Sequence, residues 1–390
     1  MLIFPFLLVC CCLLTSYGAL IEYYRKAWNG IPAFAATGSA STRISVLIPA
    51  RNEEANIAQC IESLARQTYP KTLYQVIVID DHSTDTTGEI VTGRQPPELN
   101  LIYTQLATDA TPGKKSAITT GVAIATGDLI VTTDADCRFH PDWLGTLAAF
   151  YEQKGAKFIA APVRMGDAVD GSAARTADTS SASFLSIFQT LDFITLQGIT
   201  GAAVDKHFHS MCNGANLAYE KNAFYEVGGF AGIDAIPSGD DMLLMYKIQT
   251  RHPDKVFFLK SPAAIVTTHP EATWSALFHQ RVRWASKADR YDDKRIFWVL
   301  LLVYLVNAMF LLLAIAACWR SVWLLLLLTG LIAKILFELP FVYAVAGFFG
   351  QRPLVGWFPL LQPLHICYTV VVGWMGKFGG YRWKDRTIIK

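Results

Sequence analysis

The sequence predicts an α/β domain, built on a mostly parallel sheet with helices on both faces, that is joined to transmembrane helices. Short β-rich runs alternate with segments of helical periodicity between residues 44 and 133. Long apolar runs stand at the beginning of the chain and after residue 295. A chain of 390 residues can hold one large domain or two ordinary ones beside such helices.

The apolar runs account for the hydrophobic composition, which reaches 52% of the chain. The first run covers residues 2–21 without a charge, and further runs lie at 296–318, 322–347 and 354–376. Each run approaches or exceeds the ~20 residues that an α-helix needs to cross a bilayer. We expect a transmembrane helix at 1–21 and two to three transmembrane or re-entrant helices within 296–376. The net charge of +2 gives no reason to expect nucleic acid as a partner.

Charges beside the apolar runs predict a multi-pass protein of the cell membrane whose domain lies in the cytoplasm. Arg25 and Lys26 follow the first run, and a basic segment at 285–295 precedes the second. Basic flanks remain on the cytoplasmic side. Three full crossings after residue 295 would place the basic tail, 377–390, outside, whereas one re-entrant segment would keep it inside. The first run lacks the basic start and the cleavage site of a signal peptide.

The elements of the domain follow one another in a regular order after a small-residue linker at 22–43. Strands are predicted at 44–49, 75–80, 101–104 and 128–133, and helices at 52–67 and 114–125. In the first helix Ile57, Ile61 and Leu64 recur at helical spacing. Strands that alternate with helices indicate a parallel, doubly wound sheet.

Polar side chains gather where the predicted strands end. The first strand is followed by Pro49-Ala50-Arg51-Asn52-Glu53, the second closes on Asp80-Asp81, and the fourth closes on Asp134-Ala135-Asp136. Each group alone can be explained by the preference of Pro, Asn and Asp for turns. Ligands of open α/β sheets bind outside the carboxyl ends of the strands. Three such groups on one rim therefore favour a nucleotide site.

Asp134 and Asp136 are separated by one alanine. In an extended chain residues i and i+2 point the same way, so both carboxylates would lie on one side. Like charges held so close repel unless a positive group lies between them. A divalent cation bound to a phosphate meets that requirement.

Taken in order from Ile44 to Trp284, the motifs resemble those of a membrane-integral family-2 glycosyltransferase of the GT-A fold. "VLIPARNEE", "VIVIDDHSTDTT", "GKKSAI" and "TDADC" are similar to the opening strand, the nucleotide loop, the Gly-Lys segment and the metal motif. "MCNGANLAYEKNAFYEVGGF", "SGDDMLL" and "QRVRW" resemble the acceptor-side loop, the catalytic Glu/Asp-Asp and the Gln-x-x-Arg-Trp motif. The resemblance places a Rossmann-like GT-A domain at 44–284.

The resemblance implies an inverting hexosyltransferase that uses Mg²⁺ or Mn²⁺ and a nucleotide-sugar donor, expected to be a UDP-sugar. The acceptor would be a membrane-associated lipid or lipid-linked glycan. Asp136 would be the direct metal ligand, with Asp134 nearer to the ribose. The implied donor site consists of Pro49, Ala50, Arg51, Glu53, Asp80, Asp81, Lys114 and Asp134. The residues implied for the diphosphate and the acceptor are Gln280, Arg283, Trp284, Asn213, Gly214 and Asn216.

Transfer with inversion needs a base that takes the proton of the acceptor hydroxyl. The family's second acidic residue does this, which assigns the role to Asp241 and leaves Asp240 as the alternative by one residue. Two acids at a helix start are also ordinary capping. In the same way, a helix beginning near Thr86 can be capped by Asp81, Ser83 and Asp85. Of these residues, Asp85 is expected to be a helix cap only.

Gln280, Arg283 and Trp284 fall on one face of a helix. An arginine fork can bind a diphosphate, and tryptophan offers a flat surface for a sugar ring. The alternative is an amphipathic helix at the membrane surface, with Arg281 and Lys287 directed to lipid headgroups.

Other functions were weighed against transfer to a lipid. A processive polysaccharide synthase carries similar motifs and remains open. A transporter or receptor with a nucleotide-binding domain would place charges along a pathway, yet only Lys334 and Glu338 lie within the later apolar runs, at i, i+4 spacing that favours a pair. A dinucleotide-dependent oxidoreductase is excluded because no G-x-G-x-x-G follows the first strand.

Overall fold

The computed structural model describes residues 3–93, 96–109, 111–166, 183–234, 239–287, 293–379, 381–383 and 386–388. The chain divides into two compact units. One unit, Ile31–Ala173 with Ala203–His269, is called the sheet unit here. The other, Met1–Gly30 with Ala174–Ala202 and Pro270–Lys390, is called the helix unit.

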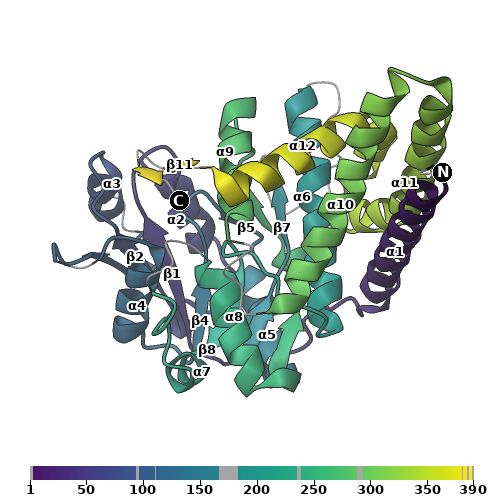
Figure 1. The fold of residues 1–390 in the computed structure, drawn as a ribbon. Helices are drawn as coiled ribbons and strands as arrows, with labels where there is room; N and C mark the ends of the chain where they lie inside the picture. Colours follow the sequence, from purple (N-terminus) through teal and green to yellow (C-terminus); the bar gives the residue numbers. More distant parts are fainter. Residues whose placement is uncertain are drawn as a thin grey trace. The chain divides into compact units, whose positions relative to one another are not determined.

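In the described residues the sheet unit contains a seven-stranded sheet in the order β3-β2-β1-β4-β8-β6-β9 (Figure 1). Its strands are β1 (Ile44–Ala50), β2 (Tyr74–Asp80), β3 (Leu101–Gln105), β4 (Leu129–Thr132), β6 (Phe158–Ala160), β8 (Leu217–Glu220) and β9 (Val256–Phe258). β1 runs parallel to both β2 and β4, and β2 runs parallel to β3. Only β8 is antiparallel to its neighbours in this sheet, as far as the described residues extend. The predicted mostly parallel α/β fold is confirmed.

The central strands form because their apolar runs can be buried on both faces, as parallel sheets require. Every residue of β2 is buried. The helix α4 (Lys114–Ile124) lies close to this layer because Gly121 has no side chain: a Cβ there would stand 2.9 Å from Ile79 and 3.1 Å from Leu47. The register pairs Ala50 with Asp80, so the loops that follow β1 and β2 begin side by side.

The predicted helix at 52–67 begins later than expected. Helix α2 covers Ile57–Ala65 and buries Ile57, Ile61 and Leu64, the residues that the periodicity selected. Asn52 has a φ of 52°, in the left-handed region, which keeps the first residues of this segment in a loop. That loop follows β1 and contributes to the site described below.

A second, smaller sheet of the sheet unit has the order β5-β10-β7 in the described residues. Its strands are β5 (Arg138–Phe139), β7 (Val163–Met165) and β10 (Val266–Thr268). The helices beside the two sheets are α3 (Thr87–Gly93), α5 (Trp143–Lys154), α7 (Lys221–Glu226) and α8 (Asp240–Arg251).

The helix unit consists mainly of long helices: α1 (Ile3–Gly30), α6 (Phe184–Asp205, as far as Ala202), α9 (Trp274–Ala285), α10 (Lys294–Ala317), α11 (Ser321–Phe348) and α12 (Phe358–Phe378). Four segments among the described residues are long and apolar enough to span a membrane: Pro5–Gly30, Lys294–Ala317, Ser321–Phe348 and Arg352–Phe378. α1 continues past residue 21, where Glu22 pairs with Arg25 at 2.6 Å and with Lys26 at 3.6 Å.

Two predicted segments are only partly described. Residues 288–292 of the basic segment 285–295 lie outside the described residues, as do 380, 384, 385, 389 and 390 of the tail 377–390. The tail begins with the end of α12, and its described residues from 381 on form two short antiparallel strands, β11 (Tyr381–Trp383) and β12 (Arg386–Ile388).

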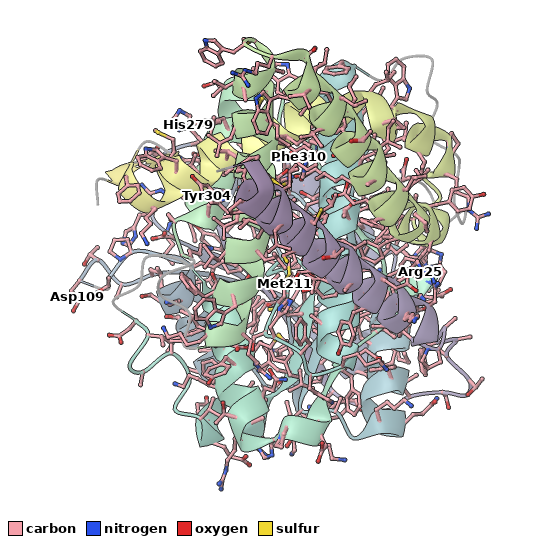
Figure 2. All side chains as sticks on the ribbon, turned by 45° about the vertical axis from the view of Figure 1, so that its right-hand side comes forward. Arg25, Asp109, Met211, His279, Tyr304 and Phe310 are labelled. Carbon is pink, nitrogen blue, oxygen red and sulfur yellow. The ribbon has the colours of Figure 1, made fainter. Side chains whose placement is uncertain are left out.

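Aromatic side chains of α10 pack against glycines of the neighbouring helices. Tyr304 and Phe310 are labelled in Figure 2. A Cβ at Gly373 of α12 would lie 2.8 Å from the Tyr304 ring, and one at Gly330 of α11 would lie 3.2 Å from the Phe310 ring. Small residues at these positions allow the helices to approach each other closely.

A closed polar cluster joins α1, α11 and α12. The Nζ of Lys334 lies 2.7 Å from Glu338 Oε1 and 2.7 Å from Gln362 Oε1. The side-chain amide nitrogen Nε2 of Gln362 donates to Glu338 Oε2 at 2.7 Å, and the Tyr17 hydroxyl donates to Glu338 Oε1. Lys334 is fully buried. The predicted pair is therefore present, and its charges compensate each other inside the helix unit.

We expect Glu338→Leu to lower the free energy of unfolding by about 3–5 kcal/mol, because it leaves the buried ammonium of Lys334 without its counter-charge. The double variant Lys334→Met/Glu338→Leu should recover most of this loss. Unfolding temperatures in detergent micelles measure both effects, with the exposed Thr329→Val as control. A double variant no more stable than the single one would contradict this account.

Candidate active site

The loops that follow β1 and β2 hold each other through a reciprocal set of hydrogen bonds. The backbone N–H of Asn52 donates to Ser83 Oγ at 3.0 Å, and Asn52 Oδ1 accepts from the N–H of Thr84 at 2.9 Å. The Arg51 guanidinium donates to the Asp81 carbonyl at 2.8 Å. The N–H of Asp81 donates to the Ala50 carbonyl at 2.8 Å. Pro49 lies within β1 and pairs with Ile79, so its part in the site is the backbone that it fixes.

Asp80 and Asp81 are both buried at the end of β2. Asp80 accepts from the N–H of Ser83 and from the Tyr103 hydroxyl, each at 2.8 Å, so its carboxylate shapes the loop. Burial and the hydrogen bond to Asp80 raise the pKa of Tyr103. Asp81 Oδ1 lies 3.2 Å from His82 Nδ1 and 3.9 Å from Arg51 Nη1. The two predicted donor ligands are thus held by partners from three segments.

Asp85 acts as a cap, as predicted. Its Oδ1 accepts from the N–H of Thr87, the first residue of α3, at 3.0 Å. Its other oxygen accepts from the N–H of Glu54 at 3.1 Å. These contacts tie the start of α3 to the loop after β1.

Asp134 and Asp136 do not lie on an extended strand, which corrects the expectation from alternation. β4 ends at Thr132, and a turn follows in which the N–H of Cys137 donates to the Asp134 carbonyl at 3.2 Å. Asp134 Oδ1 accepts from Lys114, whereas Asp136 Oδ2 accepts from Thr268 of β10 at 2.9 Å. A turn breaks the period of two, so tertiary partners set the direction of each carboxylate.

The two carboxylates nevertheless act on each other electrostatically. Burial, together with the negative charges of Asp134 and Glu53, raises the pKa of Asp136. Glu53, a predicted donor-site residue, is therefore brought to the same acidic centre. A bound divalent cation would remove the repulsion that raises this pKa.

The donor set fits a metal ion whose shell is completed by a substrate. No group of three or more His, Cys, Asp or Glu side chains in the described part of the chain is arranged to hold a metal ion. Mg²⁺ is commonly held by one or two carboxylates together with substrate phosphates. Asp134 and Asp136 can supply the protein's share of such a shell.

Lys114 connects this acidic centre to the other side of the site. It is the first residue of α4, after Gly113, whose φ of 144° few other residues adopt. Its Nζ lies 2.6 Å from Asp134 Oδ1, 3.6 Å from Asp240 Oδ2 and 3.3 Å from the Gly214 carbonyl. Burial alone would lower the pKa of Lys114, but the surrounding carboxylates raise it, so the amine is charged.

The predicted catalytic acids begin α8, after Gly239 in a left-handed conformation. Asp241 Oδ2 accepts from the N–H of Gly214 at 3.1 Å, and its Oδ1 accepts from the N–H of Met242 at 2.8 Å. Asp240 instead forms the ion pair with Lys114. A Cβ at Gly214 would stand 2.8 Å from Lys114 Nζ, so a side chain at this position would displace the ammonium group.

The two asparagines of the predicted acceptor loop have different hydrogen-bond partners. Asn213 Oδ1 accepts from the N–H of Ala215 at 3.0 Å and shapes the loop. Asn216 is fully buried; it donates to the carbonyls of Pro162 and Ala264, each at 2.8 Å, and accepts from Trp143 Nε1 at 3.1 Å. Both the nitrogen and the oxygen of its side-chain amide are therefore used in hydrogen bonds within the protein. Asn216 has a structural role and is not an open ligand for the acceptor substrate.

The Gln-x-x-Arg-Trp segment lies on α9 of the helix unit. Gln280 Nε2 donates to Glu271 Oε1 at 2.7 Å. Arg281 is 3% exposed, lies 2.8 Å from Asp192 of α6, and has its guanidinium 4.2 Å from the centre of the Trp284 ring. Arg283 is half-buried on the same helix.

The alternative that directed Arg281 to lipid headgroups is wrong, because an ion pair and a stacked ring enclose it. Sequence reasoning missed this residue, since it occupies a variable position of the motif. The signal that could have found it is Asp192, an isolated acid within a largely apolar helix.

Comparison with known proteins finds similarity in sequence and in fold. Residues 45–228 match the family model Glycosyl transferase family 2. "Probable glycosyltransferase YdaM" of Bacillus subtilis is 28% identical over 269 residues, which are 68% of this chain and 59% of that protein. "Beta-monoglucosyldiacylglycerol synthase" of a Nostoc species is 29% identical over 262 residues, 66% of this chain and 51% of that protein. The match thus spans less than two thirds of either curated relative.

A solved structure, "Mannosyltransferase PcManGT from Pyrobaculum calidifontis in complex with GDP-Man and Mn2+", aligns with 95% of this chain and 98% of that one. The TM-score is 0.64 at 19% sequence identity, a likeness that shows the fold alone. Residues 45–228 therefore match the model of glycosyl transferase family 2, and the chain has a GT-A-like α/β fold.

Proposed function

We propose that the protein is an inverting, metal-dependent glycosyltransferase that moves a hexose from a nucleotide-sugar donor, a UDP-sugar, to a lipid or lipid-linked glycan. The observation that carries the proposal is the position of Lys114. It joins Asp134, beside the strand-end loops, to Asp240 and to the loop that holds Asp241. A donor site and an acceptor site that meet at one half-buried cation suit transfer between two substrates.

On the donor side, the loops after β1 and β2 present Arg51, Asp80 and Asp81 to the nucleotide. Mg²⁺ or Mn²⁺, held by Asp136 and Asp134, would neutralise the charge that grows on the departing diphosphate. Lys114 adds a second positive charge beside it and keeps the two acidic groups together. Thr268 holds Asp136 in place through its hydroxyl.

On the acceptor side, Asp241 is proposed as the base. Its carboxylate is tied to the N–H of Gly214, in the loop that resembles the family's acceptor segment. Asp240 is less suited, because its carboxylate is already engaged in the ion pair with Lys114. The proton of the acceptor hydroxyl would pass to Asp241 as the new bond forms opposite the leaving diphosphate. The anomeric configuration is then inverted in a single displacement.

The acceptor is proposed to be a lipid because of the apolar segments of the helix unit and the name of one relative. Four segments among the described residues are long and apolar enough to span a membrane. The curated name of one relative, beta-monoglucosyldiacylglycerol synthase, contains a glycolipid product. We propose a multi-pass protein of the cell membrane with the sheet unit in the cytoplasm.

The experiment that tests this function incubates membranes containing the protein with Mn²⁺ and a panel of labelled UDP- and GDP-sugars. The products are divided into organic-soluble lipid and ethanol-insoluble polymer. Label in the lipid fraction, absent with Asp241→Asn, is expected and identifies the donor. Label in polymer alone would replace the lipid acceptor with a processive synthase. No label with any donor would contradict the proposal.

Asp136→Ala is expected to abolish metal-dependent nucleotide binding, because one of the two carboxylates available to the cation is lost. Calorimetric titration of the purified protein with UDP, with and without Mn²⁺, measures this. Asp109→Ala is the matched control, since Asp109 is exposed and labelled in Figure 2. Binding that survives in Asp136→Ala would remove Asp136 from the metal site.

Asp241→Asn should keep Mn²⁺-dependent UDP binding and lose transfer by at least roughly a hundredfold, the usual order for a general base. Asp240→Asn serves as the comparison, and we expect a smaller loss of transfer because Lys114 retains Asp134. Initial rates with the identified donor provide the measurement. An active Asp241→Asn protein beside an inactive Asp240→Asn protein would move the base to Asp240.

Gly214→Ala should lower transfer at least roughly tenfold, since small displacements at a reacting centre have large effects on rate. The added methyl group would push against the ammonium of Lys114. Gly93→Ala is the control, because a Cβ there meets no atom within 4 Å. Unfolding temperatures of both variants should stay close to wild type; equal rates in the two would refute the role given to Gly214.

A further inference from the structure

The small sheet of the sheet unit brings two arginines to one face. Arg138 of β5 and Arg164 of β7 both pair directly with Thr267, the middle residue of β10. Directly paired residues point to the same face of a sheet. The row Arg138–Thr267–Arg164 is called the arginine face here.

Among the described residues, the contacts of these side chains leave both charges without a counter-charge. Arg164 Nε donates to Thr267 Oγ1 at 3.1 Å. Arg138 Nη2 donates to Gln59 Oε1 and lies 3.3 Å from His269 Nε2. Within the part of the chain that the structure describes, neither guanidinium forms an ion pair with a carboxylate. Burial lowers the pKa of Arg164, and no neighbouring acid offsets that effect.

The spacing of the pair suits one anion. Neighbouring strands lie about 4.8 Å apart, so the two outer strands of this sheet are separated by roughly 10 Å. Two long side chains that start at that distance can converge on one group from opposite sides. Arginine forks match the oxygens of a phosphate, and a threonine hydroxyl can donate to the same group.

The arginine face is separate from the proposed metal site, although the two are close in the chain. Thr268, the residue after Thr267, donates to Asp136. Successive residues of a strand point to opposite faces, so Thr267 and the arginines lie on the other side of β10 from that hydroxyl. A phosphate on the arginine face is therefore a different group from the diphosphate held at Asp136.

We propose that Arg138, Arg164 and Thr267 bind a phosphate group carried by the acceptor, so that the acceptor is a phosphate-bearing lipid. This inference rests on the proposed function, because it assigns a substrate class to the same enzyme. It distinguishes phosphorylated lipids from neutral glycerolipids and glycolipids, which lack a group for two uncompensated arginines.

The test measures binding to the purified full-length protein in neutral detergent. The probes are dihexanoyl phosphatidate, dihexanoylglycerol, inorganic phosphate, and UDP with Mn²⁺. The wild type should bind the phosphatidate at least roughly tenfold more tightly than the neutral lipid, the order expected for charged hydrogen bonds. It should bind the phosphatidate more tightly than inorganic phosphate as well.

Arg138→Gln and Arg164→Gln should each weaken phosphatidate binding at least roughly tenfold and leave the affinity for UDP with Mn²⁺ within about twofold. Arg164→Lys keeps the positive charge but lacks the two parallel N–H donors of a guanidinium, so we expect an intermediate affinity for the phosphatidate. This variant replaces Arg164→Gln in the test if Arg164→Gln does not fold. Arg66→Gln is the control, because Arg66 is exposed on the same unit. It should match the wild type with every probe.

Three results would overturn the inference. Equal affinity for the phosphatidate and the neutral lipid would show that the face does not select phosphate. Equal affinity for inorganic phosphate would assign the site to the free ion. Loss of UDP affinity in the arginine variants would assign the pair to the donor. Failure of the wild type to bind any nucleotide with Mn²⁺ would instead defeat the proposed function, whatever the lipid probes show.

Discussion

The ammonium of Lys114 is the interaction on which the proposed site depends. Asp134, Asp240 and the loop at Gly214 come from separate parts of the chain, and each has a negative or electron-rich group aimed at the same small volume. Without a cation between them, these groups would repel one another in a partly buried setting where charge interactions are strong. Lys114 therefore makes it favourable for the turn after β4 and the start of α8 to approach each other.

The sheet unit places charges of opposite sign on two neighbouring surfaces. The acidic centre around Asp136 has an excess of negative charge: burial, together with the negative charges of Asp134 and Glu53, raises the pKa of Asp136. The arginine face carries the opposite excess. Both imbalances are costly in the free protein and are reduced when a ligand of the opposite charge binds. A divalent cation bound with the diphosphate would reduce the excess negative charge at Asp136. An anionic acceptor would reduce the excess positive charge of the arginine face.

In the helix unit, by contrast, the buried charged side chains described above are paired with other groups of the protein. Lys334, Glu338, Gln362 and Tyr17 satisfy one another, and Arg281 is enclosed by Asp192 and Trp284. These groups are compensated within the protein and await no ligand. Their physical effect is to hold particular helices in register, since breaking one partner would leave a buried charge exposed to an apolar environment.

The sequence by itself determined the strands, the long apolar helices and the polar strand ends, because burial on both faces, helix length and turn chemistry are local properties of the chain. Only the tertiary structure decided which side chains meet. Asn216 acquired a structural role through its hydrogen bonds with Trp143 and Pro162, and the register of β10 placed Arg138 and Arg164 opposite the same threonine. The physical reason is that register and helix packing bring together residues far apart in sequence, and no local periodicity encodes the direction of a carboxylate that follows a turn.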